Sequence, residues 1–101
     1  MDRILLWIKY KVMKINFKSF PVYTGISREK TVPMNISLVV SEGIYGNVAG
    51  IQAHSLAMKI YQSEGEVELA DAEVQILYES MDLFVGILAD SVRDFINNNK
   101  D

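Results

Sequence analysis

The sequence predicts a single small α+β domain, with a short amino-terminal β-hairpin or small antiparallel sheet followed by about three α-helices. A chain of 101 residues has room for one hydrophobic core. The hydrophobic share of 50% and the charged share of 23% are those of a globular protein. Apolar residues recur with period two early in the chain and with helical period later. We divide the chain into an extension at 1–12, one domain at 13–97 and a frayed tail at 98–101.

The first strand is expected at residues 13–18, where apolar and polar residues alternate as in a half-buried strand. It should end near Phe20 and Pro21, because proline lacks the donor that a central strand needs. A second extended piece around residues 30–32 would return as the other arm of a hairpin, whose tip is the polar segment 27–30.

The extension at 1–12 leaves three interpretations open. Its apolar residues alternate in the opposite phase to those of the first strand, and the phase changes between Val12 and Met13, which requires a bulge, a bend or a new element. The same residues also have helical spacing, as in an amphipathic extension. In the third interpretation, residues 1–12 are an upstream addition to a chain that begins at Met13.

Residues 34–45 fit a strand or a helix. The β-branched pair Val39 and Val40 favours a strand, whereas a helix would start at Pro33 and present one apolar face. We favour the helix, with its end at Gly46 and Asn47.

A second helix is predicted within residues 47–62 and ends before Gly65. Its core-facing residues recur at helical spacing: Ala53, Leu56, Ala57, Ile60 and Tyr61.

Polar and apolar residues alternate over residues 65–69, and this pattern predicts a short edge strand. If this strand pairs with the first, Glu66 and Glu68 come within reach of Lys14 and Lys18. Such pairing would join the two unlike parts of the chain, since residues 1–30 carry a formal charge of +5 and the remainder −8.

The last element begins near Asp71 and carries an apolar seam with spacing close to a heptad. The seam residues are Leu77, Met81, Phe84, Leu88, Val92 and Phe95. One helix over 71–97 would be about 40 Å long, longer than such a domain needs. The helix therefore either breaks near residues 80–82 and folds back, or pairs with a second copy, and we expect a homo-oligomer.

Several protein classes are disfavoured by composition. There is no cysteine, so no disulfide or thiolate site is available. The apolar run from Ile4 to Ile8 is too short for a secretion signal, and no run approaches the length of a membrane span. We expect a soluble, cytoplasmic protein that does not contact a membrane.

Neither a catalytic nor a metal site is predicted. His54 is the only histidine, and no partner residue stands at a catalytic spacing from it, although Glu42 or Glu73 could approach it in the fold. The acidic run at 64–73 lacks the ligand order of a calcium loop. We expect no enzyme activity, no metal and no cofactor.

The best partner-binding candidates combine aromatic and basic character in the extension: Trp7, Lys9, Tyr10 and Lys11. The alternative is a nucleic acid or phosphate ligand bound by basic residues between Arg3 and Lys18. The sequence pI of 5.1 disfavours that class.

Residues 50–61, 65–69 and 71–74 resemble small proteins encoded by phages and prophages of gut bacteria. The resemblance implies a short amino-terminal strand pair followed by helices, and it carries over no catalytic residues. Together with the apolar seam, it leads us to expect a non-enzymatic accessory protein of a phage or mobile element that binds a host or phage protein.

Overall fold

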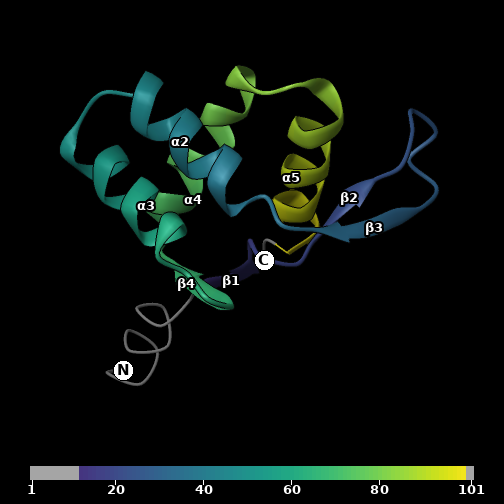
Figure 1. Ribbon diagram of the computed structural model, residues 1–101, viewed down its shortest axis with the longest axis horizontal. Coiled ribbons are helices and arrows are strands. Elements are labelled where there is room, and N and C mark those ends of the chain that lie inside the picture. The colour runs from purple at the N-terminus through teal and green to yellow at the C-terminus, as the bar shows by residue number, and fades with distance from the viewer. Residues whose placement is uncertain (1–11, 100–101) are drawn as a thin grey trace, which may run out of the picture.

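The computed structural model describes residues 12–99 and confirms the α+β class. Two two-stranded antiparallel sheets, β1 with β4 and β2 with β3, accompany the helices (Figure 1). In chain order the elements are β1 (Met13–Asn16), β2 (Phe20–Tyr23), β3 (Thr31–Met34), α2 (Ser37–Asn47), α3 (Ile51–Tyr61), β4 (Glu66–Leu69), α4 (Asp71–Ser80), the 3-10 turn η1 (Met81–Leu83) and α5 (Gly86–Asn99). The hairpin β2–β3 projects beside α5, on the side away from α2 and α3. α5 continues two residues beyond the predicted domain end at 97.

The pairing of the first strand with the strand that follows α3 is confirmed. Lys14 lies opposite Glu68, and Lys14 Nζ is 3.9 Å from Glu68 Oε2. Glu66 lies opposite Asn16 instead of a lysine, and Lys18 follows the end of β1. One of the two expected pairs of opposite charge therefore forms across this sheet.

The predicted end of the first strand near Phe20 and Pro21 is wrong. β1 ends at Asn16, whose side-chain Oδ1 accepts the backbone N–H groups of Lys18 at 3.0 Å and Ser19 at 3.2 Å. An asparagine that accepts from the backbone two residues ahead turns the chain. The chain therefore reverses before Phe20, and β2 is a separate strand.

The hairpin β2–β3 places two prolines opposite each other. Pro21 lies opposite Pro33. In an antiparallel ladder every second pair of opposed residues exchanges no backbone hydrogen bond, and this is such a pair, so neither proline ring removes one. Two positions along, the N–H of Tyr23 also points away from β3 and donates to Ser91 Oγ of α5 at 2.9 Å. The hairpin is thereby fixed to α5.

The helix favoured for residues 34–45 is confirmed as α2, but it begins at Ser37 and Pro33 belongs to β3. Asn35 accounts for the later start, because its Oδ1 accepts both the N–H of Ser37 at 3.1 Å and the Ser37 hydroxyl at 2.7 Å. The predicted end at Asn47 is correct.

The core face predicted for α3 is correct except for Tyr61. Ala53, Leu56, Ala57 and Ile60 are buried, whereas the Tyr61 side chain is 57% exposed. Eight residues after Ala53, Tyr61 is rotated about 80° around the helix axis, so it lies at the edge of the apolar stripe.

The carboxy-terminal element breaks at the predicted place. α4 ends at Ser80, η1 covers Met81–Leu83, and α5 folds back against β2. Four seam residues lie in the core, and two are partly buried against it: Leu77, Met81, Leu88 and Val92, then Phe84 and Phe95. The apolar surface that motivated pairing with a second copy is thus covered within one chain, and self-association stays a prediction.

The buried polar residues in the described part of the chain are five serines: Ser37, Ser41, Ser63, Ser80 and Ser91. Each hydroxyl donates a hydrogen bond to a nearby carbonyl or amide oxygen. Among residues 12–99, no helix combines the length and the apolar character needed to cross a membrane.

Gly43 allows α2 to approach the bend between α4 and α5. A Cβ at this position would lie 2.5 Å from Phe84 Cζ, whereas a Cβ at Gly46 in the same helix would meet nothing within 4 Å. We expect Gly43→Ala to lower the free energy of unfolding by about 1–3 kcal/mol, because Phe84 must leave its place. Gly46→Ala should raise it by about 0.5–1 kcal/mol. Urea unfolding of both variants checks the pair, and equal effects would contradict the close approach.

Tyr23 makes the attachment of the hairpin depend on pH. Its hydroxyl donates to Asp94 Oδ2 at 2.7 Å. This bond, burial and the negative charges of Asp94 and Asp90 raise the pKa of Tyr23 above its usual 10.0, and the positive charge of Arg28 opposes the shift. The neutral phenol is therefore favoured in the folded state. The stability that it contributes to the fold is fully present below pH 10 and is lost as the pH rises through the raised pKa.

We expect Tyr23→Phe to be less stable than the wild type near neutral pH, and to lose less stability between about pH 9 and pH 11. Ser91→Ala serves as the control, because it removes the acceptor of the Tyr23 N–H and leaves the phenol. This variant should be less stable throughout and keep the wild-type pH dependence. Unfolding midpoints across this pH range give the comparison, and parallel curves for Tyr23→Phe and the wild type would refute the assignment.

Candidate functional site

A groove between α2 and α3 is lined by large, exposed side chains that lie near one another on the surface. It has a volume of about 230 Å³ and a mostly apolar lining. We call it the α2–α3 groove, lined by Ser41, Glu42, Tyr45, Ala57, Met58 and Tyr61. The two helices lie side by side in Figure 1.

Helical spacing places these side chains on one face of the helix pair. Glu42 and Tyr45 are three residues apart on α2, and Met58 and Tyr61 are three apart on α3, so each pair projects from the same side of its helix. Tyr45 is 60% exposed and Met58 is 37% exposed. The groove thus has an open apolar wall on each side.

The groove extends toward the amino-terminal end of α2. Tyr61 also lines a second, more polar hollow, together with Leu38 and Lys18. Leu38 is 54% exposed and lies four residues before Glu42 on α2. The exposed apolar surface therefore covers about two turns of α2, from Leu38 to Tyr45.

Glu42 is the one charged residue among those that line the groove. Within residues 12–99, no Lys, Arg or His side chain lies within ion-pair distance of it. Its carboxylate therefore supplies an exposed negative charge between two apolar walls.

His54 lies beside the groove without lining it. Its side chain is exposed, and its ring centroid is 5.1 Å from that of Tyr45, with the rings tilted by 52°. The five buried serine hydroxyls are all bonded elsewhere, and within residues 12–99 no hydrogen bond joins the His54 ring to a serine hydroxyl.

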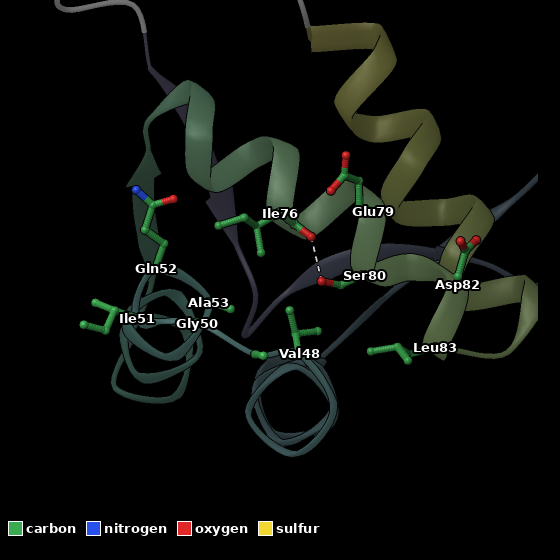
Figure 2. A pocket seen from close by; sticks show the side chains of 11 residues that line it. Val48, Gly50, Ile51, Gln52, Ala53, Ile76, Glu79, Ser80, Asp82 and Leu83 are labelled. Carbon is green, nitrogen blue, oxygen red and sulfur yellow. Dashed lines mark hydrogen bonds between the residues drawn. The ribbon is translucent and has the colours of Figure 1, made fainter.

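A separate hollow, of about 540 Å³, lies where the amino-terminal end of α3 faces the carboxy-terminal end of α4 (Figure 2). We call it the α3–α4 cleft. Val48, Ile76 and Leu83 point into it, whereas Glu79 points away. Its floor is therefore apolar.

The polar side chains around the α3–α4 cleft are largely engaged. The Ser80 hydroxyl donates to the Ile76 carbonyl at 2.6 Å, and Glu79 Oε2 accepts from Gln75 Nε2 at 2.7 Å. Asp82 Oδ1 accepts from the Arg93 guanidinium at 2.6 Å, which raises the pKa of Arg93. The Arg93–Asp82 bond joins α5 to η1 and stabilises the bend.

The densest set of charged side chains has a structural role. Arg28 donates to Asp90 Oδ2 at 2.8 Å and to Asp94 Oδ2 at 3.3 Å, and its guanidinium lies 5.9 Å from the centre of the Tyr23 ring. Arg28 adopts a left-handed backbone conformation with φ of 59° at the hairpin tip. The set joins the hairpin loop to α5.

The other sequence candidates are distributed as follows. Trp7, Lys9, Tyr10 and Lys11 lie outside the described residues, so their partner role stays a prediction. Within 12–99, no group of three or more His, Cys, Asp or Glu side chains is arranged to hold a metal ion.

Of the basic residues proposed for nucleic acid, Lys14 contacts Glu68. The described residues carry six Lys or Arg and eleven Asp or Glu, a net charge of −5. This part of the chain therefore lacks the positive excess that phosphate binding requires.

Sequence reasoning missed the α2–α3 groove. The signal was available in the spacing of Leu38, Glu42 and Tyr45, three residues on the side of α2 away from its core-facing Val40 and Ile44. Nothing in the sequence indicates which helix lies beside Leu38 and Tyr45, so their spacing alone does not predict a groove.

No family model, curated protein or solved structure matches the chain significantly. The resemblance to phage and prophage proteins therefore stays a prediction.

Glu73, one of the carboxylates considered for catalysis, is used at the start of α4. Its Oε1 accepts the Ala70 N–H at 2.9 Å and lies 3.1 Å from Lys59 Nζ. We expect Glu73→Ala to destabilise the fold by about 0.5–2 kcal/mol, because a free donor at the helix start loses its acceptor.

Glu79→Ala is the matched control for this prediction, since Glu79 lies in the last turn of the same helix, where a carboxylate opposes the helix dipole. It should leave the stability unchanged or slightly higher. Thermal unfolding monitored by circular dichroism compares the two, and an equal loss for both would show that the position of Glu73 is unimportant.

Proposed function

We propose that this chain is a non-enzymatic binding module that recognises another protein through the α2–α3 groove. The observation that carries this proposal is that three large exposed side chains, Tyr45, Met58 and Tyr61, line one groove, with Leu38 in the adjoining hollow that shares Tyr61. Tyrosine and methionine are enriched in protein interfaces, and contiguous apolar surface is typical of interaction sites.

The arrangement of polar groups supports binding over catalysis. Among residues 12–99, the buried polar side chains are hydrogen-bonded serines, and the Tyr23 hydroxyl with the charged groups of Arg28, Asp90 and Asp94 acts between the hairpin and α5. His54 contacts an aromatic ring beside the groove. A binding surface needs the apolar contacts that this groove offers.

An accessory role in a phage or mobile element is part of the same proposal. Its motive is the resemblance of residues 50–74 to phage and prophage proteins. The partner would then be a protein of the host or of the phage.

Site-specific photocrosslinking tests the groove. A photoreactive amino acid replaces Leu38, at one end of the groove, or Ile26, which is fully exposed in the hairpin loop. Irradiation of cells that express the chain natively should give a discrete adduct with another protein from position 38 and none from position 26. Tyr45→Ser combined with Met58→Ser should reduce that adduct at least about tenfold, because interface hot spots contribute about 2 kcal/mol or more each.

The folded state of each variant is verified by circular dichroism before irradiation. An identical adduct from position 26, or an adduct unaffected by the double substitution, would contradict a groove-specific interaction. An adduct with the mass of two copies would assign the groove to self-association and overturn the proposal of a separate partner.

A further inference from the structure

We infer that the partner segment is a short amphipathic α-helix with a basic side chain opposite Glu42. The inference rests on the proposed function, because it names the chemistry of the segment that the α2–α3 groove binds. Three properties of the groove lead to it: its helical walls, its length and its charge.

The walls of the groove are helices, and this favours a helical partner. Within α2 and α3 the backbone N–H and C=O groups are hydrogen-bonded along each helix, so the walls present side chains and no strand edge. An extended peptide would find no backbone partners on them. A helix satisfies its own backbone and packs its side-chain ridges into the groove between two others.

The length of the apolar surface sets the size of the partner. Leu38 and Tyr45 are seven residues apart on α2, which corresponds to about 10 Å along the axis. Three apolar side chains at positions i, i+3 or i+4, and i+7 of a partner helix span the same distance. Leu38 itself lies in the adjoining hollow, which shares Tyr61 with the groove and is more polar, with Lys18 and Glu64.

Charge decides between a second copy and a basic partner. A two-fold symmetric contact centred on the groove would place the Glu42 side chains of two copies near each other in a partly dry interface, which costs free energy. The described residues also carry a net charge of −5, so two copies repel each other. A lysine or arginine from the partner would neutralise Glu42 and position the helix.

The test is selection from a displayed library of helical peptides about 14 residues long, a length at which an isolated helix becomes marginally stable. Apolar residues are fixed at i, i+4 and i+7, and the flanking positions vary between acidic, neutral and basic residues. We expect selected peptides to carry a lysine or arginine beside the fixed apolar residues. Enrichment of acidic or neutral peptides, or of none, would overturn the inference.

Methyl NMR then locates the selected peptide. The Met58 methyl signal should shift on binding, whereas that of Met34 on β3 should not, although both side chains are partly exposed. Glu42→Gln should weaken binding about two- to fivefold, as expected for one solvent-accessible ion pair. Glu79→Gln, outside the groove, should leave the affinity unchanged.

Equal losses for the two variants, or a shift of Met34 instead of Met58, would contradict the inference. The two proposals fail in distinguishable ways. A specific adduct from position 38 with no selected basic helix leaves the groove as a binding site and rejects its helical, basic ligand. Absence of that adduct in native cells rejects the proposed function, whatever the library yields.

Discussion

The reversal of the chain at residues 81–85 is the constraint on which the rest of the structure depends. It folds α5 back, so that an apolar seam long enough to pair with another chain is buried within this one. Phe84 in the bend lies against α2 where Gly43 leaves room for its ring, and Arg93 of α5 bonds to Asp82 in η1. Part of the reversed segment stays exposed, including Leu83 and Val85.

The proposed binding surface lies where α2 and α3 meet. Each helix buries one face, with Val40 and Ile44 on α2 and Leu56 and Ile60 on α3. Because α4 covers only part of this helix pair, a second apolar stripe stays exposed on the other side. A small domain has more apolar residues than its interior can enclose. Here part of that excess, Tyr45, Met58 and Tyr61, lies around one groove, and the rest is distributed over the surface of residues 12–99.

Electrostatics organises the opposite part of the molecule. The basic first third of the chain contacts the acidic remainder at two places, through Lys14 with Glu68 and through Arg28 with Asp90 and Asp94. These contacts fix the two strand pairs to the helices. Glu42 lies outside these contacts and is the charged residue that lines the α2–α3 groove.

By itself, the sequence determined the α+β class, favoured a helix over residues 34–45, gave a break near residues 80–82 as one of two outcomes, and offered pairing of the first strand with residues 65–69. Hydrophobic period and charge act between near neighbours or along one element, so a linear pattern contains them. The linear pattern did not determine that Asn16 ends β1, that Tyr61 stays exposed, or that Tyr45 faces a groove shared with Met58. Those outcomes depend on which elements pack against each other. Only the tertiary structure decides this, because a side chain stays exposed only where no other element covers it.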